Sequence, residues 1–316
     1  MTSFLEFEKP IAALHARIGE LRDTAKQDGI DLDADISKLQ VKADKMLALT
    51  YANLTPWQKC RVARHPERPH FRDFIEQMFS DFVPLCGDRL FGEDAAIVGG
   101  FARLGDRRVM VIGHEKGSDT ESRLKHNFGM GRPEGYRKAV RLMDMAERFG
   151  LPVVTLVDTS GAFPGVDAEE RGQAEAIARA TERCLSLRVP MVAAIVGEGG
   201  SGGAVALASA ERVLMLEHAV YSVISPEGCA SILWRTADKA DEAAEAMRIT
   251  AQQLRTLGVV DHIVDEPVGG AHRDPASAIA GLALAIEEEL DDLASKSAVE
   301  RRQMRHEKYL AIGEMG

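Results

Sequence analysis

The chain has 316 residues, which suffices for one large core with an appendage or for two domains. Its hydrophobic content of 45% and charged content of 28% are ordinary for a globular protein, and its formal net charge of -10 argues against non-specific binding to nucleic acid. No apolar run is long enough to cross a bilayer, and the first residues, "MTSFLEFEKP", lack the basic and apolar regions of a secretory signal. We therefore expect a soluble, cytoplasmic protein.

The four cysteines are far apart in the sequence, and no C-x-x-C pair occurs among Cys60, Cys86, Cys184 and Cys229. This spacing fits neither a disulfide framework nor a zinc ribbon, and it suits a reducing compartment. We expect no metal site in this chain.

Residues 1–55 are predicted to form a helical hairpin. Apolar residues recur at helical spacing on both sides of the turn-like "QDGIDLDAD": Ile11, Leu14, Ile18 and Leu21 before it, and Ile36, Leu39, Ala43 and Met46 after it. Such narrow seams predict two antiparallel helices, either as a self-contained surface hairpin or as a partner-binding one. Residues 56–94 are predicted to be a connector and a helix: a Pro-rich, basic connector is followed by an amphipathic stretch around Phe71–Phe82.

Residues 95–316 are predicted to form an α/β domain. The runs "AAIVGGFARL" and "VMVIG", joined by Gly105-Asp106, predict a hairpin, and Pro133 and Gly150 mark the start and end of a helix. Next, "PVVTLVDT" predicts a buried strand, which leads through "SGAFPG" into a helix from about Asp167 to Leu187. A second strand, "PMVAAIV", leads through the loop "GEGGSGG" into a short helix. Strands that alternate with helices indicate an α/β fold.

The remaining elements follow the same alternation. "RVLMLEH" predicts a strand, and Ser225 can cap a helix that has Pro226 in its first turn. Thr250 and Gln253 form a capping-box pair ahead of the strand "VVDHIV", and the tail from Pro275 is predicted to be helical.

The glycine segment allows three chemistries. Gly199-Gly200-Ser201-Gly202-Gly203 fits the G-x-S-x-G pattern of a serine hydrolase, and the downstream residues that could support Ser201 are Asp238, Asp241, His262 and His272. A hydratase would instead use Glu198 and Glu227 to activate water. In the third reaction, main-chain N–H groups at the start of a helix stabilise an oxygen that becomes negative, and glycines let the substrate approach the backbone.

A resemblance to a known family favours the third chemistry over the other two. The stretches that carry it are "FLEFEKPI", "ARHPERP", "IVGGFARLGDRRVMVIGHEKG", "NFGM", "PEGYRKAVRLMDMAERFG", "GAFPGVDAEERGQAEAIAR", "GEGGSGGA", "YSVISPEGCASILW" and "GGAHRDP". Together they resemble the alpha subunit of the bacterial-type acetyl-CoA carboxylase carboxyltransferase over nearly the whole chain.

The resemblance implies a crotonase-like spiral of ββα units and transfer of carboxylate from carboxybiotin to acetyl-CoA, which gives malonyl-CoA for fatty-acid synthesis. It also implies a complex of two alpha and two beta subunits, with zinc only in the beta subunit and biotin on a separate carrier protein. The chain itself lacks the A-M-K-M attachment sequence of biotin.

The resemblance also implies site residues. The backbone amides of Gly202 and Gly203 would hold the ureido oxygen of biotin, with Gly199, Gly200 and Ser201 beside them. Gly161, Phe163 and Gly165 would form the facing wall. Lys116, Arg123 and Lys125 would contact the phosphates of CoA, or else form a solvated helix face.

Two segments depart from the family pattern. Ser160 stands where the family usually has proline, and Ser118 and Glu121 stand where basic residues are common.

Overall fold

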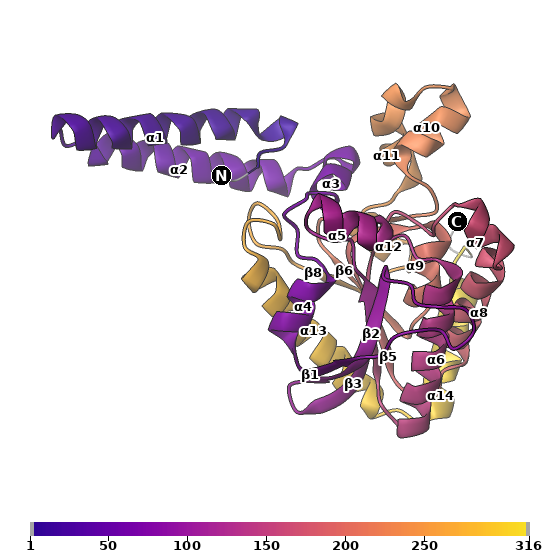
Figure 1. Ribbon diagram of the computed structural model, residues 1–316. Helices are drawn as coiled ribbons and strands as arrows, with labels where there is room; N and C mark the ends of the chain where they lie inside the picture. The colour runs from indigo at the N-terminus through magenta and orange to yellow at the C-terminus, as the bar shows by residue number, and fades with distance from the viewer. Residues whose placement is uncertain (1–2, 314–316) are drawn as a thin grey trace.

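The computed structural model describes residues 3–313, and in this part of the chain eight strands form one mixed sheet (Figure 1). The strands are β1 (Phe79–Pro84), β2 (Ile97–Leu104), β3 (Arg107–His114), β4 (Val153–Thr159), β5 (Met191–Gly200), β6 (Arg212–Leu216), β7 (Val220–Ser222) and β8 (His262–Val264). Their order is β1-β2-β3-β4-β5-β6-β8, and β7 pairs with the C-terminal end of β5. The pairs β1–β2 and β2–β3 are antiparallel, and all the other pairs are parallel.

The described helices lie around this sheet and beyond it. The α-helices are α1 (Lys9–Asp28), α2 (Asp33–Ala52), α3 (Pro56–Ala63), α4 (Phe71–Met78), α5 (Thr120–Lys125), α6 (Pro133–Phe149), α7 (Val166–Glu170), α8 (Gln173–Ser186), α9 (Ser201–Ala208), α10 (Pro226–Trp234), α11 (Ala240–Met247), α12 (Ala251–Thr256), α13 (Pro275–Ala294) and α14 (Ala298–Ala311). Short 3-10 turns are η1 (Glu6–Glu8), η2 (Asn127–Gly129) and η3 (Ala237–Lys239).

The parallel strands β4 and β5 form the centre of the core. Every residue of both strands is buried, which explains why their sequences are continuous apolar runs rather than alternating ones. Helix α6 packs on β2 and β3, α9 packs on β4 and β5, α8 lies against both of these helices, and α14 lies against α8. Helices α4 and α13 pack on the sheet elsewhere, α4 on β1 and α13 on β5, β6 and β8 (Figure 1). This arrangement brings the carboxyl ends of β4 and β5 to one edge of the molecule, where ligands of parallel sheets bind.

The N-terminal hairpin, α1 and α2, extends away from the body (Figure 1). Inside the hairpin, Ile11, Ile18 and Ala43 are buried, in agreement with the predicted seams. The carboxylate of Glu8 ties its base to the body, because it accepts hydrogen bonds from the Tyr51 hydroxyl at 3.0 Å and from Arg273 at 2.6 Å. The division of the chain at residues 55 and 94 stays a prediction.

The structure confirms several predicted elements, together with the residues that begin, cap or end them. The hairpin of β2 and β3 turns at Gly105-Asp106, and α6 begins at Pro133 and ends at Gly150 with φ 66. Ser225 caps α10 by accepting a hydrogen bond from the Gly228 amide at 3.1 Å.

Other boundaries were predicted wrongly. The basic connector contains helix α3, which Thr55 and Gln58 begin with a capping box. The stretch around Phe71–Phe82 is not one helix: it becomes strand β1 at Phe79, because this segment pairs with the edge of β2. Helix α3 and strand β1 are too short to show a distinct hydrophobic periodicity in the sequence.

The two long predicted helices are also divided. The one from Asp167 to Leu187 breaks into α7 and α8 at Gly172, whose φ of 80 lies in the left-handed region. The C-terminal tail breaks after α13, and Ser297 and Glu300 begin α14 with a capping box.

None of the described helices is both long and apolar enough to span a membrane. Across residues 3–313, no group of three or more His, Cys, Asp or Glu side chains is placed to hold a metal ion.

Candidate active site

The predicted glycine loop between β5 and α9 does not exist as a loop. Strand β5 continues through Gly200, because its last three residues pair with β7, and α9 begins at once with Ser201. The chain reverses direction at Ser201, whose φ of 52 is a left-handed value. Gly202 and Gly203 therefore lie in the first turn of a helix.

Two of the glycines are required by packing. A Cβ on Gly200 would lie 2.2 Å from the carbonyl oxygen of Ser160, and one on Gly203 would lie 2.7 Å from the carbonyl carbon of Gly161. The turn after β4 and the start of α9 thus pack backbone against backbone. Gly202 differs, because its nearest contact would be an ordinary 3.4 Å from the Ile177 side chain.

The start of α9 offers free hydrogen-bond donors. The first amides of a helix have no acceptor within the helix, and Gly200 at the N-cap has no side chain that could supply one. The amides of Gly202 and Gly203 therefore carry the partial positive charge of the helix end and can bind a negative oxygen.

A cleft of about 730 Å³ opens at this junction. Its lining consists of Arg64, Ser160, Gly161, Ala162, Phe163, Pro164, Glu169, Ile177, Glu198, Ser201, Gly202, Val223, Ile224, Ser225 and Glu227. Of the residues predicted for the site, the structure brings Gly161, Phe163, Ser201 and Gly202 together in this lining. Gly165, Gly199, Gly200 and Gly203 do not line it.

The facing wall is a turn held by its own side chains. The Thr159 hydroxyl accepts a hydrogen bond from the Gly161 amide at 3.1 Å and donates one to the Gly161 carbonyl at 2.7 Å. The turn therefore keeps its shape with Ser160 in place of proline. The half-buried ring of Phe163 lies under the Arg132 guanidinium, 4.3 Å from the ring centroid, and a Cβ on Gly165 would come within 2.2 Å of the ring.

The residues that a serine hydrolase would need beside Ser201 do not line its cleft. His272 stacks on His65 with ring centroids 3.9 Å apart, and His262 lies 3.5 Å from Glu289. The carboxylate of Asp238 binds the hydroxyl of Thr236 on its own turn. No described histidine lines the cleft, so the turn at Ser201 has no imidazole base beside it.

Glu198 and Glu227 are close together, as a hydratase pair would be, but an arginine lies between them. The Arg64 guanidinium binds Glu198 at 2.6 Å and Glu227 at 2.6 Å. Carboxylates held in charge-assisted bonds to a guanidinium are poorly suited to activate water. Sequence reasoning missed Arg64, whose only signal was its place in "ARHPERP".

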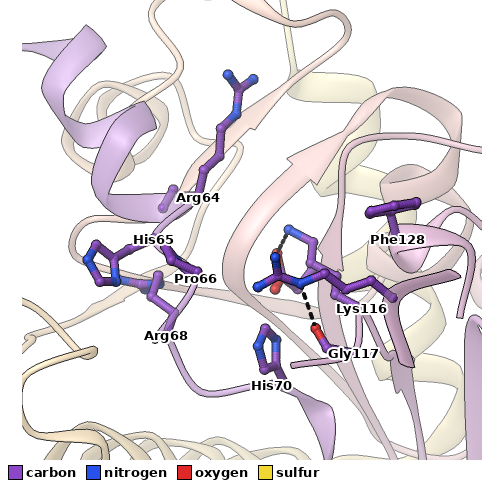
Figure 2. A pocket seen from close by; sticks show the side chains of 11 residues that line it. Arg64, His65, Pro66, Arg68, His70, Lys116, Gly117 and Phe128 are labelled. Carbon is purple, nitrogen blue, oxygen red and sulfur yellow. Dashed lines mark hydrogen bonds and ion pairs between the residues drawn. The ribbon is translucent and has the colours of Figure 1, made fainter. Parts of the chain in front are cut away.

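A second, smaller pocket of about 160 Å³ adjoins the cleft, and Lys116, Gly117, His70 and Phe128 converge on it (Figure 2). Of the predicted phosphate contacts, Lys116 and Arg123 line this pocket, whereas exposed Lys125 does not. The Lys116 ammonium lies 2.5 Å from the Asp158 carboxylate, and Arg123 Nε donates to the Gly117 carbonyl at 3.3 Å. Lys116 is thus partly neutralised.

The fold is that of the crotonase-like carboxyltransferases. It is similar to the transcarboxylase 12S crystal structure with a TM-score of 0.60, at 22% identity, over 77% of this chain and 45% of that chain. It is also similar to a Pseudomonas malonate decarboxylase hetero-tetramer in complex with coenzyme A, with a TM-score of 0.57, at 16% identity, over 68% of this chain and 86% of that chain.

Closer relatives define the family. The model of the acetyl co-enzyme A carboxylase carboxyltransferase-like family matches residues 4–313. Acetyl-coenzyme A carboxylase carboxyl transferase subunit alpha is 70% identical in Rhizorhabdus wittichii, over 99% of this chain and 100% of the relative, and 66% identical in Zymomonas mobilis over the same shares. The chain belongs to the family of acetyl-CoA carboxylase carboxyltransferase alpha subunits.

Proposed function

We propose that this chain transfers carboxylate from carboxybiotin, carried on a separate carrier protein, to acetyl-CoA, and so forms malonyl-CoA for fatty-acid biosynthesis in the cytoplasm. It would act in a complex of two alpha and two beta subunits, with zinc only in the beta subunit. The observation that carries the proposal is the pair of free amides at Gly202 and Gly203 beside the cleft. The hydratase and hydrolase alternatives lack a comparable arrangement.

The residues present fit biotin. The amides of Gly202 and Gly203 supply donors without a side chain in the way, and the Gly202 backbone lies open to the cleft. When bound, carboxybiotin would supply the carboxyl group, and its ureido oxygen would gain negative charge as that group leaves. Fixed donors of this kind lower a barrier by roughly 3–4 kcal/mol each in a site that excludes water. The Phe163 ring and the turn at Gly161 would cover the apolar part of the ligand.

The smaller pocket supports a contact with CoA phosphates. Arg123 forms no ion pair with any described residue, and Lys125 is exposed beside it. Lys116 would contribute less, because Asp158 already binds its ammonium.

The test is reconstitution with a partner. Carboxyl transfer makes two oxygens negative, one on biotin and one on the thioester of acetyl-CoA, and so needs two sets of donors. We expect the purified chain alone to show no biotin-dependent decarboxylation of malonyl-CoA, and the mixture with a zinc-containing beta subunit to turn over. Full turnover by the zinc-free chain alone would overturn the shared site.

A further inference from the structure

Arg64 connects two parts of the molecule that both line the cleft. It follows directly after α3, and its side chain extends away from His70 and Lys116 (Figure 2). Its Nε and Nη2 donate to one oxygen of Glu198 at 3.0 and 2.6 Å, and its Nη1 donates to Glu227 at 2.6 Å. Three of its five N–H groups are thereby committed.

The two carboxylates belong to different elements. Glu198 lies on β5, two residues before the junction with α9, and Glu227 lies in the first turn of α10. Helices α10 and α11 form a lobe that projects from the body (Figure 1). The lobe rests on α3 through a small apolar cluster that contains Cys60, Ala63 and Ala244. Arg64 adds an ionic link between this lobe and the sheet.

The same link offsets one of the two negative charges that the glutamates place in the cleft. The Glu198 side chain is 9% exposed, and that of Glu227 is 38% exposed. Burial raises the pKa of Glu227, but hydrogen bonds from its own backbone and from Arg64 outweigh this effect and hold the pKa below its ordinary value. Without Arg64, two carboxylates would face a cleft that receives an anion, and one of them would be buried without a partner.

We infer that Arg64 is a positioning residue for carboxyl transfer, which fixes the α10 wall of the cleft against β5 and offsets one of the two negative charges of Glu198 and Glu227. The catalytic part of this inference rests on the proposed function, whereas the mechanical part does not.

The mechanical part is tested by hydrogen exchange on the full chain without a partner. We expect Arg64→Gln to speed amide exchange over residues 223–234, and Glu227→Gln to do so to a smaller extent. Arg179→Gln is the matched control, because Arg179 also bridges two carboxylates, Glu175 at 3.0 Å and Glu182 at 2.9 Å, but lies outside the cleft. Wild-type exchange in both Arg64→Gln and Glu227→Gln would overturn the link.

The catalytic part is tested by kinetics with the biotin carrier. We expect Arg64→Gln to lower kcat/KM for the carrier by about tenfold or more, with Arg64→Lys intermediate and Arg179→Gln unchanged. Adding Glu227→Gln to Arg64→Gln should restore part of the loss, because it removes a charge that no longer has a partner. A purely structural role predicts instead that the second substitution worsens the defect.

The two parts fail separately. If the wild-type complex shows no carboxyl transfer, the proposed function is wrong, and the exchange measurement still decides whether Arg64 holds the lobe. If the complex is active and Arg64→Gln keeps its wild-type kcat/KM, the inference about positioning is wrong while the proposed function stands.

Discussion

Single residues at the start of α9 combine tight packing with open donors. Gly203 is closed in by the backbone of the turn after β4, whereas Gly202 lines the cleft and would meet only an ordinary contact if it carried a Cβ. Between strand and helix, Ser201 holds a left-handed conformation that costs a non-glycine residue about 1 kcal/mol or more. Packing and the proposed binding of an oxyanion therefore make different demands on adjacent residues, and substitutions can separate the two.

Gly202→Ala should separate activity from stability. Alanine favours a helix over glycine by roughly 0.5–1 kcal/mol, and the added methyl meets only an ordinary contact with Ile177, so we expect the melting temperature to hold or rise. Because the methyl lies beside the proposed donors, kcat/KM should fall by about tenfold. Gly203→Ala is the comparison: its methyl clashes with Gly161, so stability and activity should fall together. Full activity in Gly202→Ala would contradict the placement of biotin there.

Ser201→Ala should keep most carboxyl-transfer activity, because no described histidine lines the cleft and the proposed reaction uses backbone amides. Its stability should stay within about 0.5 kcal/mol of wild type, since the backbone conformation is unchanged. Activity assays and labelling with a fluorophosphonate check this. A covalent label on Ser201 that abolishes activity would return the serine-hydrolase alternative.

At the scale of elements, a buried arginine fastens the C-terminal helix α14 to α8. Arg305 is fully buried, and its guanidinium donates to the carbonyls of Cys184 and Leu187 at the end of α8. It also lies 3.4 Å from Glu211, whose pKa burial raises to about 7 despite the arginine. The last carbonyls of a helix need such donors from outside it.

Arg305→Met should therefore lower the free energy of unfolding by about 3–5 kcal/mol, because it leaves Glu211 and the carbonyls at the C-terminal end of α8 without their partner. Arg302→Met, on the exposed side of the same helix, should change it by less than about 0.5 kcal/mol. Denaturant unfolding of the two variants measures this difference. Equal stabilities would show that apolar packing alone holds α14.

At the scale of the whole molecule, a group of buried histidines lies where the hairpin meets the body. The His218 ring packs edge-on against Tyr51 at 5.5 Å, and His272 stacks on His65. Burial lowers the pKa of His218 to about 4, and burial together with His65 lowers that of His272 to about 3. The folded protein holds these imidazoles neutral.

Acid should weaken this junction. As the pH falls from about 6.5 toward 4, the unfolded chain binds protons at these imidazoles that the folded chain does not bind, so the free energy of unfolding falls. His218 alone should contribute roughly 3 kcal/mol across that window. His218→Gln should flatten the pH dependence of unfolding, whereas His306→Gln, which removes an exposed imidazole, should not. An unchanged slope in His218→Gln would contradict the neutral junction.

The amino-acid sequence determined the elements whose signals are local. The helical seams of the hairpin, the buried runs of β4 and β5, and the caps at Ser225 and Thr250 specify their structures through residues a few positions apart. The sequence also singled out the segment at Gly202 and Gly203, because a cluster of glycines between a strand and a helix is a local pattern. The family resemblance, by contrast, lay in motifs spread along the chain.

Only the tertiary structure decided how distant segments meet. The glycine segment is part of strand β5 as far as Gly200, because β7 pairs with it there. No residue within the segment indicates that β7 will be its partner. Arg64 binds Glu198 and Glu227, which lie 134 and 163 residues further along the chain. Their spacing in the sequence therefore gives no sign of this contact. Lys116 was partly neutralised by Asp158 in the same way. Charge pairing and strand pairing act between residues that are neighbours in space. Segments that are distant in the sequence become such neighbours only when the chain has folded.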